Sequence, residues 1–192
     1  MQKMLLMLGL SIAIFGLGAC SSSTSSSTAE TGQPKERWYN KKETIGGLSF
    51  SIWNYSKVYI ANVKVEGRGL GFAQGVKNYG EAIHDGTACC VEIAKGLTAR
   101  VTFEADLGDG DKKHELIVPV ENYNDKLSGY ATLHYLPGNT GVLEISMSMA
   151  WPRRDLLQNQ LKKMGLHDVV FDKEGIWNDK TQNEIARERF PD

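Results

Sequence analysis

The sequence has almost no net charge and very little cysteine. Its 22 lysines and arginines nearly balance its 23 aspartates and glutamates, so the formal net charge is −1. Nucleic-acid-binding domains usually carry a clustered basic excess, and the lack of one argues against nucleic acid as a partner. Only three cysteines occur in 192 residues. A chain of this length suits one domain and can bury a hydrophobic core without disulfide cross-links.

Sequence motifs of common catalytic centres are also missing. The chain has neither the G-x-S-x-G motif of serine hydrolases nor the H-E-x-x-H motif of zinc proteases. Its four histidines, at positions 84, 114, 134 and 167, are isolated from one another. We expect His114 and His134 to face solvent, because each lies opposite the apolar residues of a predicted strand. The sequence therefore predicts a protein that is not an enzyme and needs no cofactor.

Two groups of potential metal ligands lack the spacing that metal sites need. His84 precedes the adjacent pair Cys89 and Cys90, but structural zinc sites favour two to four residues between cysteines, and no fourth ligand is apparent. The acidic segment at residues 106–111 lacks the glycine and glutamate positions of an EF-hand calcium loop, and it fits a tight hairpin turn better. We expect no metal site.

The N-terminus contains the one long apolar segment. Lys3 precedes an apolar run at residues 4–18, which is shorter than the roughly 20 residues of a membrane-spanning helix. This length favours a cleaved signal peptide at residues 1–19 over a permanent transmembrane segment. The run ends in Leu17-Gly18-Ala19-Cys20, which resembles the lipobox of bacterial lipoproteins. The alternative is an ordinary secretory signal whose cleavage site falls near a cysteine.

The lipobox resemblance implies that Cys20 becomes the acylated first residue of the mature chain. In such lipoproteins an aspartate after the cysteine favours retention at the inner membrane, and here that residue is Ser21. The sequence thus predicts a lipid anchor in the outer membrane, with the rest of the chain in the periplasm. Residues 20–34 are rich in serine and threonine. Because such residues cannot offset the entropy of ordering, we expect a flexible tether.

Residues 35–192 are expected to form one periplasmic domain made mainly of strands. Period-two alternation of apolar and polar residues is typical of half-buried strands. It occurs at residues 48–52, 59–65, 97–105, 116–120, 131–135 and 143–149. We expect the first two segments to pair as a hairpin and Asp109-Gly110 to close another. Pro119 indicates an edge position for its strand.

The pattern changes to helical spacing near the C-terminus. Pro152 and the leucines that follow predict a helix that ends before Gly165, and a second short helix is predicted from Asp179, with Gln182 as its capping partner. The predicted fold is therefore an antiparallel β-sandwich-like domain with one or two C-terminal helices.

Glycines are concentrated in residues 67–86. Phosphate-binding loops need G-x-G-x-x-G between a strand and a helix, but here the spacing is G-x-G-x-G and no helical pattern follows. We expect a long surface loop, and long loops in compact domains often bind partners. Phe72, Tyr79 and His84 are the side chains that we expect to touch a partner.

The adjacent cysteines Cys89 and Cys90 leave two alternatives open. Neighbouring residues of a regular strand point to opposite faces, so a vicinal disulfide requires the chain to depart from ideal strand geometry. The predicted periplasmic location is oxidising, and with Cys20 acylated no other cysteine can pair within the chain. Two largely buried thiols are the other alternative.

Four short motifs follow one another in an informative order. They are Val58-Tyr59-Ile60-Ala61-Asn62-Val63, Cys89-Cys90-Val91 after the glycine-rich segment, Gly96-Leu97, and His134-Tyr135-Leu136-Pro137-Gly138. This order resembles a poorly characterised family of proteobacterial lipoproteins catalogued as a domain of unknown function, and the resemblance covers roughly residues 48–151. The chain departs from the family pattern where Ala94-Lys95 stands in place of an expected tryptophan, and it carries an additional helical tail.

The resemblance implies a function. Such lipoproteins are often encoded beside type VI secretion phospholipase effectors, and some resemble the cognate immunity proteins. The implied protein is a membrane-anchored periplasmic inhibitor that binds a secreted phospholipase effector and protects the cell from self or sibling intoxication. One alternative is a structural or assembly lipoprotein of the cell envelope or the secretion apparatus. Another is an enzyme acting on envelope polymers, which would need a site of converging polar groups.

Overall fold

The structure of the protein is a computed structural model that describes residues 44–123, 128–172 and 177–189. The predicted signal peptide at residues 1–19, the predicted acylation site Cys20 and the predicted tether at residues 20–34 lie outside these described residues and stay predictions. No helix in the described part of the chain is long and apolar enough to cross a membrane.

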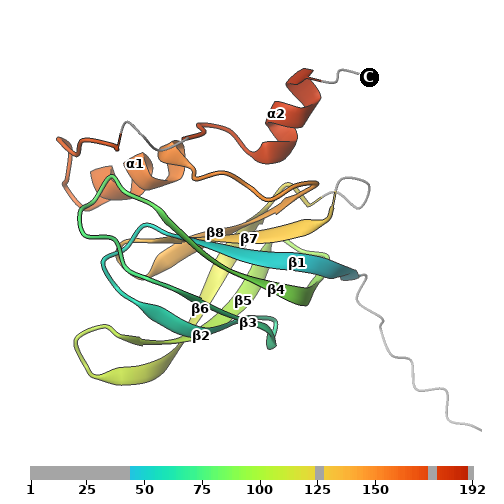
Figure 1. Ribbon diagram of the computed structural model, residues 1–192, viewed down its shortest axis with the longest axis horizontal. Coiled ribbons are helices and arrows are strands. Elements are labelled where there is room, and N and C mark those ends of the chain that lie inside the picture. Colours follow the sequence, from blue (N-terminus) through green and yellow to red (C-terminus); the bar gives the residue numbers. More distant parts are fainter. Residues whose placement is uncertain (1–43, 124–127, 173–176, 190–192) are drawn as a thin grey trace, which may run out of the picture. The chain divides into compact units, whose positions relative to one another are not determined.

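Strands dominate the described residues, and two short helices follow them (Figure 1). The strands are β1 (Thr44–Asn54), β2 (Ile60–Val65), β3 (Arg68–Ala73), β4 (Ile83–Ala94), β5 (Thr98–Asp106), β6 (Asp111–Glu121), β7 (Tyr130–Leu136) and β8 (Thr140–Ser146). The helices are α1 (Arg154–Lys163) and α2 (Gln182–Arg189). The prediction of a mainly β domain with C-terminal helices is confirmed.

The strands form one mixed sheet. Their order is β3-β2-β5-β6-β8-β7-β1-β4. Most neighbours are antiparallel, but β1 runs parallel to β7, and β6 runs parallel to β8. These parallel pairs distinguish the sheet from a purely antiparallel sandwich. The two strands of each pair are separated by other elements in the chain, so no tight turn forces them to run antiparallel.

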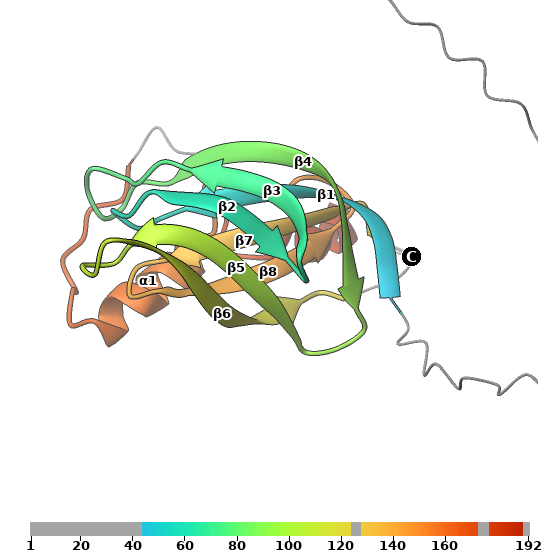
Figure 2. The ribbon, with the colours of Figure 1, turned by 90° about the horizontal axis from the view of Figure 1, so that it is seen from below.

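The sheet curls until its two terminal strands, β3 and β4, lie side by side (Figure 2). Glycines permit this close approach. A Cβ atom on Gly86 of β4 would lie 3.4 Å from the carbonyl oxygen of Phe72 in β3. A Cβ atom on Gly71 would lie 2.7 Å from Ile52 Cδ1. The backbone of β3 therefore packs directly on a core side chain of β1, which a larger residue at position 71 would prevent.

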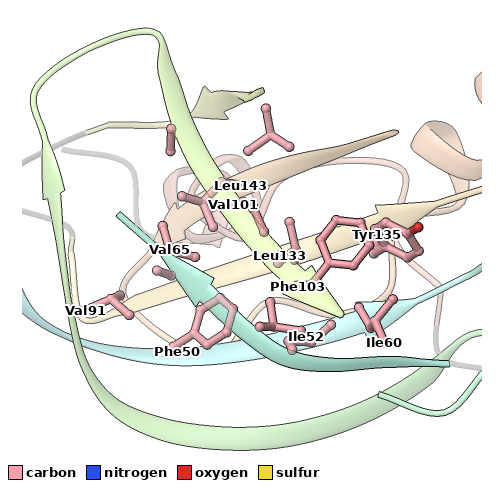
Figure 3. Packing of buried hydrophobic residues seen from close by; sticks show 14 of the residues in the cluster. Phe50, Ile52, Ile60, Val65, Val91, Val101, Phe103, Leu133, Tyr135 and Leu143 are labelled. Atoms are coloured by element: carbon pink, nitrogen blue, oxygen red, sulfur yellow. The ribbon is translucent and has the colours of Figure 1, made fainter. Parts of the chain in front are cut away.

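The curled sheet encloses the main hydrophobic core (Figure 3). Strand β5 shows how the sequence produces it: Ala99, Val101, Phe103 and Ala105 are buried, and the residues between them are exposed or half-buried. Phe103 meets Tyr135 of β7 edge to face, with ring centroids 5.3 Å apart. Each large apolar side chain that is fully buried in such a core contributes about 1.5–3 kcal/mol.

The predicted strand pairings are partly confirmed and partly wrong. The hairpin at Asp109-Gly110 is confirmed, because β5 and β6 pair in continuous register on either side of it. The hairpin predicted from residues 48–52 and 59–65 is wrong: β1 pairs with β4 and β7, and β2 pairs with β3 and β5. The edge position predicted from Pro119 is also wrong, since β6 lies between β5 and β8.

A buried asparagine joins the loop between β1 and β2 to the loop after β3. The side-chain amide of Asn54 donates hydrogen bonds to the carbonyl oxygens of Val58 and Gln74, at 2.8 and 2.9 Å. Val76 N also donates to the Ser56 carbonyl oxygen at 2.8 Å. These bonds hold the loop after β1 against the loop after β3, and they satisfy backbone groups that a hairpin ladder would otherwise pair.

Helix α1 packs over a second, smaller cluster, and α2 is capped by its own side chains. Helix α1 buries Leu157 and Leu161 against Tyr55 and Leu136. Helix α2 begins two residues later than predicted. Its capping box is formed by Thr181 and Glu184, and not by Asp179 and Gln182. Thr181 N donates to Glu184 Oε2 at 2.8 Å, and Glu184 N donates to Thr181 Oγ1 at 3.3 Å.

Gly80 and Gly108 form a matched pair that tests how the C-terminal segment packs. Their φ angles are +100° and +102°, so alanine strains both backbones to the same degree. A Cβ on Gly80 would also collide with the carbonyl oxygen of Val170, whereas Gly108 has no atom within 4 Å. We expect Gly80→Ala to lower the free energy of unfolding by about 1–3 kcal/mol more than Gly108→Ala, measured by urea denaturation. Equal losses would contradict this packing.

Candidate functional site

The three residues predicted to form a partner-binding loop lie in different surroundings. Residues 67–86 are not one long loop, because they include β3 and the start of β4; that expectation is wrong. Phe72 lies on β3 with 49% of its surface exposed. Tyr79 packs against the second cluster, and Lys57 Nζ lies 4.8 Å from its ring centroid. Contact of these residues with a partner stays a prediction, and only Phe72 among them is freely exposed.

His84 takes part in packing between β1 and β4. Its ring centroid lies 4.8 Å from that of Trp53, whose Nε1 donates to the Ala150 carbonyl oxygen at 2.7 Å. Burial lowers the pKa of His84, and the nearby Asp85 only partly opposes this. The imidazole Nε2 is buried and has no hydrogen-bond partner in the described part of the chain. His84 thus packs against the tilted ring of Trp53.

Cys89 and Cys90 are joined in a disulfide between neighbouring residues, and both are exposed. They lie where β4 bulges away from β1. Ala88 pairs with Phe50 and Val91 pairs with Leu48, so two residues of β4 oppose one residue of β1. Such a bulge is the departure from regular strand geometry that a vicinal disulfide requires. The alternative of two buried thiols does not fit the exposure of this pair.

A buried polar network lies between the sheet and the helices. Its centre consists of Tyr55, His134, Glu144 and Arg153, all at most 5% exposed. The Tyr55 hydroxyl accepts the backbone N–H of Arg153 at 2.8 Å and lies 2.7 Å from His134 Nδ1. Burial raises the pKa of Tyr55, so the phenol keeps its proton at neutral pH.

The position of His134 overturns the prediction that it faces solvent. It does point away from the main core, as the alternation of β7 implies, but the helices and the segment between them cover that side. Residues 131–136 of β7 are all buried as a result. His114 differs from the prediction too: it is half-buried, with its ring 5.5 Å from that of Phe103 and its Nε2 3.1 Å from the Ala105 carbonyl oxygen.

Glu144 and Arg153 form the charged centre of the network. Arg153 Nη1 lies 3.1 Å from Glu144 Oε2 and 3.1 Å from Glu121 Oε2, and Nη2 lies 2.6 Å from Asp155 Oδ2. His134 Nε2 lies 3.4 Å from Glu144 Oε2, an electrostatic contact without hydrogen-bond alignment. Burial by itself would raise the pKa of Glu144, but the neighbouring His134, the Gln182 amide and the charge of Arg153 together lower it. Glu144 is therefore ionised at neutral pH.

The network also fastens α2 to the sheet. Glu144 Oε1 accepts the backbone N–H of Gln182, in the first turn of α2, at 2.6 Å. The buried side chain of Asn183 donates to the Ile145 carbonyl oxygen at 3.1 Å and accepts the Met147 N–H at 3.3 Å. Strand β6 pairs with β8 only at Leu143 and Glu144, and Asn183 bonds to backbone groups that follow these two residues. The donors and acceptors are directed at one another, so the network holds the C-terminal segment in place.

A polar depression lies on the outer face of β2, β5 and β6. One hollow of about 450 Å³ is lined by Lys64, Gly67, Arg100, Thr102, Lys113, His114 and Glu115. An adjoining hollow of about 300 Å³ is lined by Asn62, Lys64, Thr102, Phe103, Glu104 and Lys113. Because the two share three lining residues, we treat them as one depression and call it the basic hollow.

Two exposed aromatic side chains lie nearby, Phe72 on β3 and Tyr59 directly before β2. Ile60 of β2 pairs with Ala73 of β3, and both are buried, so the adjacent residues Tyr59 and Phe72 point to the outer face. They are 47% and 49% exposed. The outer face of β3, β2, β5 and β6 therefore combines an apolar part with a charged part. Phe72 was expected from the sequence to contact a partner. The basic hollow was not predicted, because the residues that line it lie on three separate strands.

The described residues contain no group of three or more His, Cys, Asp or Glu side chains that could hold a metal ion. Residues 53–141 match a protein family described as "Protein of unknown function (DUF3304)". The match extends from the end of β1 to the start of β8, and it includes all four motifs on which the sequence resemblance rests. The chain is thus similar to an uncharacterised family. No curated protein and no solved structure matches the chain.

Arg153→Met tests the buried network against its exposed neighbour. This change would leave Glu144 ionised and unpaired in a buried site, which typically costs about 3–5 kcal/mol of unfolding free energy. Arg154 is 43% exposed in its side chain and lies 3.7 Å from Asp179, so Arg154→Met is expected to cost at most about 1 kcal/mol. Chemical denaturation measures both variants. Similar losses of unfolding free energy for the two variants would show that the buried ion pair stabilises the fold no more than the exposed one.

The lowered pKa of Glu144 predicts acid sensitivity. A carboxyl whose folded pKa lies below its ordinary value of 4.5 stabilises the fold above that value, and the stabilisation is lost as the pH falls through the folded pKa. We expect the unfolding free energy of the wild type to fall more steeply than that of Glu144→Gln between about pH 5 and pH 3. Denaturant midpoints recorded across this range test it, and parallel curves would contradict it.

Proposed function

We propose that this chain is a membrane-anchored periplasmic immunity protein that binds and inhibits a type VI secretion phospholipase effector. The observation that carries the proposal is the N-terminal sequence: an apolar run that ends in Leu17-Gly18-Ala19-Cys20, followed by a Ser/Thr-rich segment. The likeness to an uncharacterised family across residues 53–141 agrees with the expected domain of unknown function, and the inhibitory role itself is inferred from the sequence resemblance.

The proposed anchor gives the inhibitor its position. Each acyl methylene buried in a membrane contributes about 0.8 kcal/mol, and stable anchoring takes more than one chain, as bacterial lipoproteins have. A phospholipase that attacks from the periplasm must approach the membrane. An inhibitor attached to that membrane by Cys20 meets the enzyme where its substrate is.

The domain would act by occupying a surface of the effector and not by chemistry of its own. In the described residues the titratable groups at the centre of the buried network, Glu144 and Arg153, are bound to each other and to the helices. The outer face of β3, β2, β5 and β6 offers aromatic and charged side chains to solvent. Specific interfaces bury more than about 1,000 Å² in total, and several adjoining strands can supply a contact of that size.

A capture experiment tests this function. The full chain, with a C-terminal tag, is isolated from membranes in mild detergent and mixed with the type VI effectors secreted by the same strain. We expect it to retain a phospholipase whose activity is suppressed in the complex and returns on dissociation. In cells, Cys20→Ser is expected to reduce protection against that effector, while the same variant still binds it in solution, because only the anchor is lost.

The contrary result is equally clear. Recovery of envelope or secretion-apparatus proteins without a phospholipase would favour a structural or assembly lipoprotein instead. If wild type and Cys20→Ser protect equally and bind equally, the protein would still be an inhibitor, but the lipid anchor would have no role in protection.

A further inference from the structure

Strand register brings three cations together on the outer face of the sheet. Thr102 of β5 pairs with Lys64 of β2 on one side and with Glu115 of β6 on the other, so these residues form a row across three strands. Arg100 precedes Thr102 by two residues, and Lys113 precedes Glu115 by two, which puts both on the same face as the row. Lys64, Arg100 and Lys113 all line the basic hollow.

These three cations have no ion-pair partner among the described residues. Other exposed cations do have one: Arg68 lies 2.6 Å from Glu92 and Lys112 lies 3.0 Å from Asp109. The larger part of the basic hollow is lined by three cations and a single carboxylate, and with Glu104 of the smaller part included the whole hollow has an excess of one positive charge. An unpaired cluster of this kind attracts an anionic group, since the like charges within it repel one another.

Two further carboxylates lie near the three cations. Glu66 accepts the backbone N–H of Arg100 at 2.7 Å, and Glu104 accepts the side-chain amide of Asn62. Both carboxylates accept hydrogen bonds from neutral donors and keep their negative charge, and among the described residues neither makes an ion pair with the three cations. Tyr59 and Phe72 are exposed near the same strands, and aromatic residues together with arginine are the types that dominate binding energy in protein interfaces.

Charge distribution decides between a membrane and a protein as the occupant. A membrane surface presents a broad sheet of negative charge, which favours a face with a large basic excess. The outer face mixes cations with Glu66, Glu104 and Glu115, and the whole chain has a formal charge of −1. A confined positive hollow of about 450 Å³ instead matches one protruding acidic loop of a protein.

We infer that the basic hollow, with Tyr59 and Phe72 beside it, is the docking surface of this protein and receives a carboxylate-bearing loop of its protein partner. This inference rests on the proposed function, and it specifies the surface and the chemistry of the contact. Lys64, Arg100 and Lys113 pair with acidic side chains of the effector, and the two aromatic rings cover an adjoining apolar patch.

Charge reversal at the basic hollow tests the inference. The full chain carrying Lys64→Glu, Arg100→Glu and Lys113→Glu is compared with wild type and with a control variant of the same charge, Lys77→Glu, Lys162→Glu and Lys163→Glu. All six positions are exposed, so neither variant disturbs the core. Affinity for the purified phospholipase effector is measured by calorimetry over a range of salt concentrations, with circular dichroism as a check of folding.

We expect the reversal at the basic hollow to weaken binding by about 100-fold or more, with the control variant within about threefold of wild type. Added salt should weaken the wild-type complex, because charge pairs at a rim are screened. Binding that survives the reversal unchanged overturns this surface while the proposed function stands. A wild type that binds no phospholipase overturns both.

A second arm tests the membrane as occupant. Wild type and both variants are mixed with phosphatidylglycerol vesicles, after Cys20→Ser has removed the acylation site from each. We expect no vesicle binding that depends on Lys64, Arg100 and Lys113. Vesicle binding that the reversal at the basic hollow abolishes, together with unchanged effector binding, would overturn the inference in favour of a lipid surface. A neutral variant, Arg100→Gln, should weaken effector binding less than Arg100→Glu if charge carries the contact.

Discussion

The ion pair between Arg153 and Glu144 is the interaction on which the C-terminal half of the structure depends. Both side chains are buried, and without Arg153 the fully buried charge of Glu144 would lose its arginine partner. Glu144 also holds the first turn of α2 through Gln182, and the backbone of Arg153 holds the Tyr55 hydroxyl. The pair therefore closes the helices over β7 and β8, and this explains why nearly every residue of those two strands is buried.

The same closure divides the sheet into two parts with different roles. The helices lie over β7 and β8, away from β2 and β5 (Figure 1). The outer face of β3, β2, β5 and β6 keeps its side chains exposed, and it carries both Tyr59 and Phe72 and the basic hollow. One part of the sheet thus uses its charges to hold the chain together. The other leaves three cations without partners among the described residues, and in our account those cations bind the effector.

Sequence patterns succeeded where the partners are close in the chain. The Asp109-Gly110 turn and the helix that buries Leu157 and Leu161 both follow from local spacing. The patterns failed for β1, whose partners β4 and β7 are selected by a core that forms only when distant segments meet. The buried network was missed for two reasons. Tyr55 and Arg153 are 98 residues apart, and a polar residue that alternates with apolar ones indicates solvent only when no helix covers that face.

Hydrogen–deuterium exchange of the complex with the phospholipase effector would locate the docking surface on the sheet. Backbone amides of β2, β5 and β6 should exchange more slowly in the complex than in the free protein, because the effector would cover the basic hollow. Amides of α1 and α2 should be unchanged, since the helices lie away from that surface. Slower exchange confined to the helices, or no change anywhere in the sheet, would contradict the account.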